Sequence, residues 1–303
     1  MIRIRLFFER TVRFINQRCE GNVAVQRRDE MRFAFVVSSG LGYQIPDLFL
    51  TEESFSEFRK ALKCLSENNF DGVELNLHFG DKQKLARIKE SIESSGLKLA
   101  SVGTGLLYTR DKLSFTSRDA KERARAVSIV KQLVQFAGSK EASVIIGLVR
   151  GPVGMRDAAS YFGNCLGECD SAARHFGTRI AVEAMNRYEA SFLNTADEVS
   201  TFIEREKLTS TGILLDTFHM NIEEQSIDET VRKYHSKIVH FHIADSNRWP
   251  PGYGHLKVED SLNLLKTLGY RGWVSAETLP KPSRVEAVEA TSKFLGSLGF
   301  MRN

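Results

Sequence analysis

The sequence predicts an α/β fold, a closed parallel (β/α)8 barrel (TIM barrel). Three observations support this. The chain has 303 residues, a usual length for one such barrel. Eight short runs rich in Val, Ile and Leu alternate with helical patterns. The last four of these runs end in polar residues, as expected where successive parallel strands end on one rim. We expect residues 31–303 to form one catalytic domain and residues 1–30 to be an N-terminal extension.

The expected strands show little alternation of apolar and polar residues, which is typical of strands buried on both faces. They are Arg32–Ser38, Gly72–Leu77, Lys98–Gly103, Ala142–Leu148, Arg179–Ala184, Gly212–Asp216, Lys237–Ile243 and Gly272–Glu277.

Helical patterns fill the intervals between these strands, and several end at a glycine, a common helix terminator. They are Ser54–Asn69, Asp81–Ser95, Ala120–Ala137, Ala158–Phe176, Thr195–Glu206, Asp228–His235, Glu259–Leu268 and Glu286–Leu298. A doubly wound open sheet is the second choice, but no GxGxxG or GxxxxGK[ST] motif follows any strand.

Charge and composition exclude several classes of protein. The net charge is +4, of which residues 1–30 contribute +3 (seven Arg against four acids), so the rest is nearly neutral. A neutral body argues against nucleic-acid binding. No apolar run is long enough to span a membrane. Cys165 and Cys169 form no CxxC pair, and we interpret them as small apolar residues of a helix. These features fit a reducing, cytoplasmic location.

Four residues close four successive strand-like runs in the second half of the chain: Glu183, Asp216, His242 and Glu277. Their spacings of 33, 26 and 35 residues each suit one strand and one helix. A single acid in such a place is explained well by a cap or a buried ion pair, but four at one rim are not. Three carboxylates and one imidazole favour Mn²⁺, Mg²⁺ or Co²⁺, and Zn²⁺ also accepts such ligands.

Other polar residues follow these ends closely. Glu189, His219 and Arg248 lie three to six residues beyond a candidate ligand, where they could hold substrate hydroxyl groups. Each could equally make structural contacts. His240 and Glu74 lie within expected strands, and we interpret both as neighbours of the metal ligands rather than ligands.

Two long loops are expected above the same rim. One contains Tyr108, Arg110 and Phe115, and the other carries Arg150 between glycines. Loops at this rim commonly bind substrate, although both could be ordinary connections. Because guanidinium groups bind carboxylates in a bidentate manner, Arg150 and Arg248, with Arg110, would suit an acidic sugar.

Several stretches resemble a known family, the xylose isomerase-like barrels, and within it the ketose 3-epimerase (tagatose/psicose epimerase) branch. They are VEAMNRYEASFLNTADE, LLDTFHMNIEE, HFHIADSNRWPPGYGH and VSAETLP. The strings VIIGLVRG and ADSNRWPPGYGH are most similar to the 5-keto-L-gluconate epimerase type, which acts on keto-hexuronates. The resemblance covers residues from Met31 onward and is strongest after position 142.

The resemblance implies that Glu183, Asp216, His242 and Glu277 bind a divalent metal, Mn²⁺ above all. Glu183 and Glu277 would also carry protons on opposite faces of the sugar, through a metal-bound enediolate. Glu189, His219 and Arg248 would bind substrate oxygens. It also implies a homo-oligomer and a small sugar or sugar acid as the partner.

This chemistry explains why two carboxylates are required. Inverting a carbon beside a ketone needs one base to take the proton and another to return it on the other face. A metal would stabilise the negative charge that develops. An aldose–ketose or hydroxypyruvate-type isomerase on the same barrel is the alternative. An endonuclease IV-like phosphodiesterase fits less well, because it uses several metals and more histidines.

Overall fold

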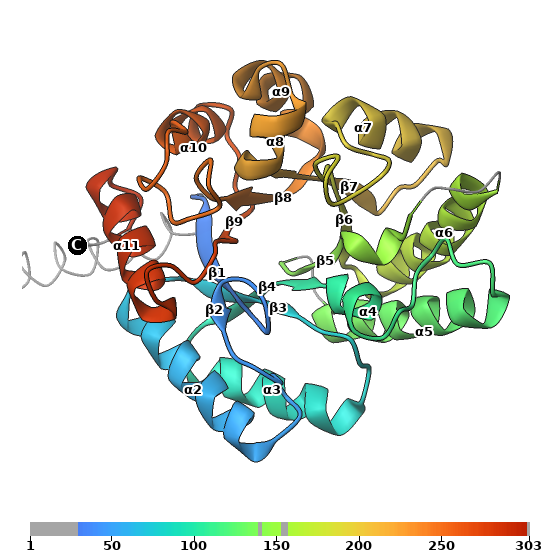
Figure 1. Ribbon diagram of the computed structural model, residues 1–303, viewed down its shortest axis with the longest axis horizontal. Helices are drawn as coiled ribbons and strands as arrows, with labels where there is room; N and C mark the ends of the chain where they lie inside the picture. The colour runs from blue at the N-terminus through green and yellow to red at the C-terminus, as the bar shows by residue number, and fades with distance from the viewer. Residues whose placement is uncertain (1–29, 139–140, 153–156, 302–303) are drawn as a thin grey trace, which may run out of the picture.

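The computed structural model describes residues 30–138, 141–152 and 157–301 of the chain. Figure 1 shows strands at the centre and helices arranged around them. The strands are β1 (Arg32–Ser38), β2 (Tyr43–Gln44), β3 (Gly72–Asn76), β4 (Lys98–Gly103), β5 (Ser143–Ile146), β6 (Arg179–Glu183), β7 (Thr211–Asp216), β8 (Ile238–Ile243) and β9 (Trp273–Ala276). The predicted extension, residues 1–30, falls outside the described residues except for Glu30.

The barrel is closed by parallel pairing in chain order. Strand β1 pairs with β3, each later strand pairs with the next, and β9 returns to β1 through the register Arg32 to Trp273. The short strand β2 pairs with the end of β1. Closure confirms the predicted (β/α)8 barrel, and it brings the carboxyl ends of all eight main strands to one rim.

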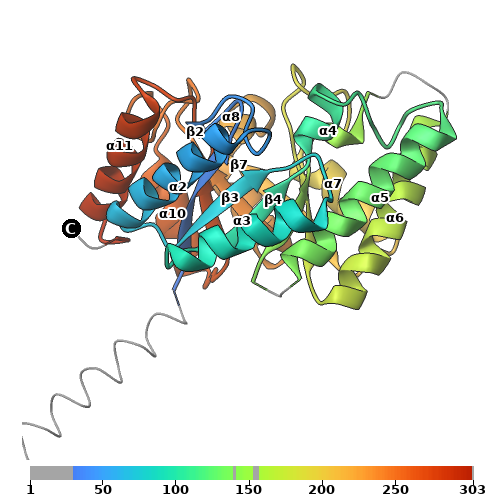
Figure 2. The ribbon, with the colours of Figure 1, turned by 90° about the horizontal axis from the view of Figure 1, so that it is seen from below.

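Helices follow the strands, and the longer ones cover the outer face of the barrel. They are α2 (Glu52–Glu67), α3 (Lys82–Ser94), α4 (Gly105–Thr109), α5 (Ala120–Ala137), α6 (Ala158–Phe176), α7 (Ala196–Arg205), α8 (Thr217–Glu223), α9 (Ile227–Tyr234), α10 (Val258–Thr267) and α11 (Arg284–Ser297), with 3-10 turns η2 (Leu148–Arg150) and η3 (His235–Lys237). In the turned view of Figure 2, β2, α4 and α8 gather at the same end of the barrel.

Local sequence explains where these helices begin and end. Thr51 and Ser54 form a reciprocal capping box at the start of α2. Gly138 and Gly177, both left-handed, end α5 and α6. Within α6, Cys165 and Cys169 are buried among core residues, which agrees with their interpretation as apolar helix residues.

Two kinds of side chain fill the fold. Large apolar residues pack between the strands and the helices as the main core. Polar side chains from β3, β4, β8 and β9, namely Glu74, Ser101, His240 and Ser275, are buried and contact one another. Since β3 and β8 are not neighbours in the sheet, these contacts cross the barrel interior. The interior close to the rim is therefore polar, and it supports the site described next.

Candidate metal centre and substrate cavity

The four predicted metal ligands lie together at the rim. Glu183 and Asp216 are the last residues of β6 and β7, His242 lies near the end of β8, and Glu277 follows β9. One ligand atom from each lies within 4.8 Å of the others. The Nδ1 atom of His242 is 3.9 Å from Glu183 Oε1, 3.7 Å from Asp216 Oδ2 and 3.8 Å from Glu277 Oε2. Consecutive strands of a parallel barrel place these atoms around a common centre.

Two of these ligand atoms have no hydrogen-bond partner among the described residues. His242 Nδ1 and Asp216 Oδ2 are buried and make no hydrogen bond, although buried polar atoms are almost always paired. The other oxygen of Asp216 accepts a hydrogen bond from the Phe218 amide at the start of α8, at 2.7 Å, which leaves Oδ2 facing the site. The residues therefore fit a divalent cation with oxygen-rich coordination.

Ionisation differs among the carboxyl groups of the site. Burial raises the pKa of Glu277 to about 7, although the nearby charges of Arg248 and His242 lower it. Burial also opposes ionisation of Asp216, but His219 and His242 outweigh it and hold the pKa at about 2. For His242, burial lowers the pKa while Glu74, Asp216 and Glu277 raise it, and the net result lies well above its usual value. Such perturbed groups at one place are typical of functional sites.

Arg248 joins two carboxylates across the mouth of the site. Its guanidinium donates to Glu189 Oε1 and to Glu277 Oε2, both at 2.8 Å, and lies over the ring of Phe218. The Arg248 backbone is left-handed, with φ of 61°, an uncommon conformation for a residue with a side chain and one that is often found at binding sites.

His219 lies behind Glu183. Its Nε2 atom is buried and 3.4 Å from Glu183 Oε1, without the geometry of a hydrogen bond. The side-chain amide of Asn186 donates to His219 Nδ1 at 2.7 Å and to Glu189 at 3.1 Å. Because Nδ1 accepts, the ring proton of neutral His219 is on Nε2, directed at the site. Asn186 was not predicted as a site residue from the sequence. Its position three residues after Glu183 was the signal that could have indicated it.

A cavity of about 190 Å³ opens over these residues. Its polar wall includes Glu74, Glu183, His242, Arg248 and Glu277. Most of the uncharged lining residues come from the ends of β1, β3, β4 and β5 and the loops after them: Ser38, Gly40, Leu41, Asn76, Gly103, Thr104, Gly105, Leu106, Thr109, Ile145, Gly147 and Leu148. The volume corresponds to about six water molecules at about 30 Å³ each, which suits a single sugar better than a polymer.

Arg150 does not lie where the sequence predicted. Its side chain is 1% exposed, and its guanidinium donates to the backbone carbonyls of residues 146, 147, 183, 192 and 193. Arg150 is absent from the lining of the cavity. With its donors occupied, it stabilises the ends of β5 and β6 and cannot act as a carboxylate clamp, so we correct this assignment.

The loop that carries Tyr108 and Arg110 is partly helical, because α4 begins at Gly105. Arg110 is exposed at the end of α4 and does not line the cavity, while Phe115 is buried against the ring of Phe162. Of this loop, Leu106 and Thr109 reach the cavity instead.

Comparison with known proteins identifies the family to which the chain is similar. Residues 62–298 match the model of the family described as xylose isomerase-like TIM barrel. D-psicose 3-epimerase of Enterocloster bolteae is 27% identical over 256 residues, which cover 80% of this chain and 83% of that protein. L-ribulose 3-epimerase of Mesorhizobium japonicum is 28% identical over 229 residues, 74% of this chain and 76% of that protein. The predicted family, and a sugar-epimerase class among its relatives, are thus confirmed.

Solved structures agree on the fold. D-allulose 3-epimerase from Methylomonas sp. in complex with D-allulose superposes with a TM-score of 0.73 at 19% identity, covering 89% of this chain and 97% of that one. The apo form of 3-keto-D-glucoside 4-epimerase from E. coli has a TM-score of 0.70 at 20% identity, covering 88% of this chain and 100% of that one.

In the described residues, no helix is long and apolar enough to cross a lipid bilayer.

Proposed function

The chain belongs to the xylose isomerase-like TIM barrel family, and we propose that it is a metal-dependent sugar epimerase acting beside the carbonyl group of a ketose. One observation carries this proposal. The three carboxylates and one imidazole of successive strand ends converge within 4.8 Å beneath a cavity of about 190 Å³. Sugar epimerases among the relatives support the same reaction class.

In this proposal Glu183, Asp216, His242 and Glu277 hold the cation, with Mn²⁺ as the first choice and Co²⁺ or Mg²⁺ as alternatives. The ion would supply Lewis-acid stabilisation of the oxygen that becomes negative when the adjacent proton leaves.

Glu183 and Glu277 would carry the protons. They come from β6 and from the end of β9, which are not neighbours in the barrel, so they approach the cavity from separate directions. One carboxylate would accept the proton from the carbon beside the ketone, and the other would return a proton on the opposite face. Arg248 is hydrogen-bonded to Glu277 and would keep that carboxylate oriented.

Substrate hydroxyl groups would be held by Glu189, His219 and Arg248. Arg248 and Glu189 line the cavity as a pair, and a substrate hydroxyl there could donate to Glu189. His219 is buried and absent from the cavity lining, and its Nε2 atom has no hydrogen-bond acceptor among the described residues, so a substrate oxygen would have to reach it beside Glu183.

The described lining favours a neutral ketose over a keto-hexuronate such as 5-keto-L-gluconate or tagaturonate. Arg248 is the one Lys or Arg among the described residues of the lining, and both Glu189 and Glu277 already occupy it. Even with a bound divalent cation, the five carboxylates of Glu74, Glu183, Glu189, Asp216 and Glu277 exceed the positive charge of the ion and Arg248, so a carboxylate or phosphate on the substrate would meet net negative charge.

The proposal is tested by incubating the Mn²⁺-loaded protein with a panel of neutral ketoses and keto-uronates in D₂O. We expect deuterium at the carbon beside the ketone of a neutral ketose, together with its epimer. An aldose product labelled at the carbon next to its aldehyde would identify an aldose–ketose isomerase instead. Turnover of keto-uronates alone would overturn the proposal that the substrate is a neutral ketose.

A homo-oligomer and a cytoplasmic location stay predictions.

A further inference from the structure

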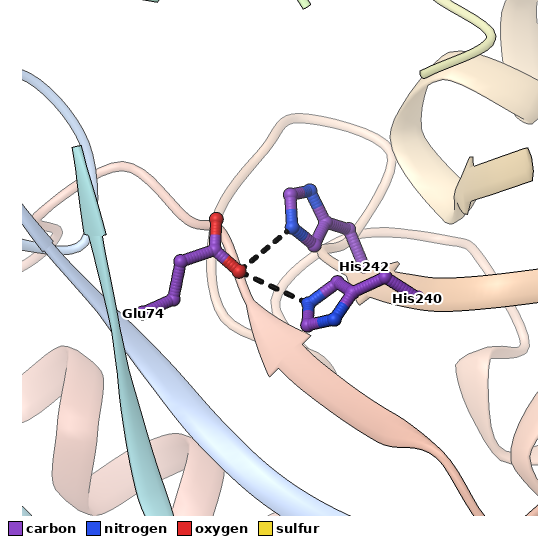
Figure 3. A group of neighbouring side chains, drawn as sticks. All are labelled: Glu74, His240 and His242. Carbon is purple, nitrogen blue, oxygen red and sulfur yellow. Dashed lines mark hydrogen bonds and ion pairs between the residues drawn. The ribbon is translucent and has the colours of Figure 1, made fainter. Parts of the chain in front are cut away.

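A buried carboxylate on the far side of the barrel contacts the histidine ligand. Figure 3 shows Glu74 of β3 facing His240 and His242 of β8. Glu74 Oε2 lies 3.1 Å from His242 Nε2 and 3.0 Å from His240 Nε2. The hydroxyl of Ser101 on β4 donates to the same oxygen at 2.6 Å. Glu74 is 1% exposed, so water does not compete for these contacts.

This contact determines which nitrogen of His242 is available to a cation. An ionised carboxylate only accepts hydrogen bonds, so His242 Nε2 must carry the proton that it donates to Glu74. Nδ1 of the neutral ring then presents a lone pair, and this is the atom surrounded by Glu183, Asp216 and Glu277. Without the acceptor, the proton could sit on Nδ1 and block coordination.

We propose that Glu74 is a positioning residue, which fixes the tautomer and the ring orientation of His242 and thereby raises the affinity of the site for its cation. The inference rests on the proposed metal site and assigns a role to a residue outside the four ligands. Carboxylates that accept from the second nitrogen of a metal-binding histidine act in this manner in other metal sites.

Glu74, His240 and His242 could also be considered as three ligands of a separate ion. The contacts argue against that. A single oxygen of Glu74 faces both imidazoles at hydrogen-bond distance, and Ser101 donates to it as well. Ser275 lies 2.8 Å from the same nitrogen of His240. These atoms already contact one another at hydrogen-bond distance, whereas the Nδ1 atoms of His240 and His242 have no hydrogen-bond partner among the described residues. Nδ1 of His242 lies within 4 Å of three carboxylate oxygens, which places the cation there.

The test compares Glu74→Gln and Glu74→Leu with Ser275→Ala as the matched control. Glutamine keeps an oxygen acceptor but removes the negative charge, and leucine removes both. Ser275→Ala removes a side-chain contact of His240 and leaves the contact between the side chains of His242 and Glu74 in place. The dissociation constant for Mn²⁺ is measured by competition with a fluorescent chelator, after removal of bound metal. Thermal unfolding of each metal-free protein reports on folding separately.

We expect Glu74→Gln to weaken Mn²⁺ binding about 10-fold and Glu74→Leu about 100-fold, with Ser275→Ala unchanged. Equal Mn²⁺ affinity in the wild type and in Glu74→Gln would overturn the positioning role, and this variant decides the question should the leucine variant not fold. A wild type that binds no Mn²⁺ would instead contradict the proposed metal site itself, so the two failures are distinguishable.

A spectroscopic readout addresses the tautomer directly. In ¹⁵N-histidine spectra of the wild type loaded with diamagnetic Mg²⁺ or Zn²⁺, the ring N–H proton of His242 should show a one-bond coupling to Nε2. In Glu74→Leu the Nε2 proton signal should shift or exchange rapidly with solvent, and it should stay in place in Ser275→Ala. A His242 ring protonated on Nδ1 in the wild type would contradict the inference.

Discussion

The two halves of the barrel contribute different chemistry to one cavity. Strands β6 to β9 supply the candidate metal ligands and both proposed proton carriers. The ends of β1, β3, β4 and β5 supply mostly small, uncharged lining residues, of which Glu74 is the charged exception. The second half therefore suits the reaction itself, and the first half suits the shape of the substrate.

This contrast separates two kinds of variant. Changes in the second half should alter metal binding or turnover, since they touch the charged groups. Changes in the first-half lining should alter substrate affinity and preference with turnover largely kept, except at Gly147, where an added side chain would displace Glu183.

Glu183→Gln and Glu277→Gln should each slow deuterium exchange into the substrate by about 10²- to 10⁴-fold, because an amide cannot carry the proton. Rates are measured with saturating Mn²⁺, so that weaker metal binding does not contribute. Glu204→Gln, at an exposed acid paired with Lys237, is the control and should be unaffected. Normal exchange in both site variants would exclude these residues as proton carriers.

Gly147→Ala tests a first-half residue that touches the second half. A Cβ atom at position 147 would lie 2.7 Å from Glu183 Oε2, so the carboxylate must shift. We expect turnover to fall about 100-fold, as for a displacement of about 1 Å at a reacting group. Gly167→Ala in α6 meets no atom within 4 Å and should retain full activity. Unchanged turnover in Gly147→Ala would show that the position of Glu183 matters little.

Metal affinity should fall as the pH is lowered. In the folded protein the pKa of Glu277 is about 7, and that of His242 is raised well above its usual value. Both groups must lose a proton to bind a cation, so binding releases protons below these pKa values. Because each of the two groups can release one proton, we expect Mn²⁺ affinity to drop by about 10-fold to about 100-fold per pH unit below pH 7, as measured by titration calorimetry in buffers of different ionisation enthalpy. An affinity independent of pH between 5 and 7 would contradict the assignment.

Thr109→Val should have the smallest effect. Thr109 lines the first-half wall, and its hydroxyl donates to the Gly105 carbonyl at 3.3 Å, so it could accept a hydrogen bond from a substrate hydroxyl. Losing one hydrogen bond of about 0.5–1.5 kcal/mol should raise KM less than about 10-fold with kcat kept. Steady-state kinetics on the best ketose separates the two constants. A large loss of kcat would break the proposed division between the halves.

The sequence predicted much of this arrangement, because the regular period of strand and helix places successive strand ends on one rim. All eight main strands lie within two residues of their predicted bounds, and Glu183, Asp216, His242 and Glu277 converge as expected. The short elements β2, α4 and α8 were missed, since a few residues carry too little pattern to predict them.

Contacts that depend on tertiary packing were the harder part. Arg150 was expected at the substrate because it lies in a glycine-bearing loop, but its side chain turns inward to backbone carbonyls that no sequence pattern identifies. Glu74 was recognised as unusual because it is an acid within a strand. Its partner His242 lies 168 residues later and across the barrel, so only the fold identifies the contact.

The metal content of the protein tests the central claim most directly. After metal removal and reloading with Mn²⁺, the wild type should retain about one ion per chain, because one group of four ligand atoms converges and two of them lack hydrogen-bond partners among the described residues. Asp216→Asn should retain less, because it loses one ligand charge. Elemental analysis by mass spectrometry gives the number. No bound ion, or about three as in an endonuclease IV-like site, would contradict a single-cation epimerase.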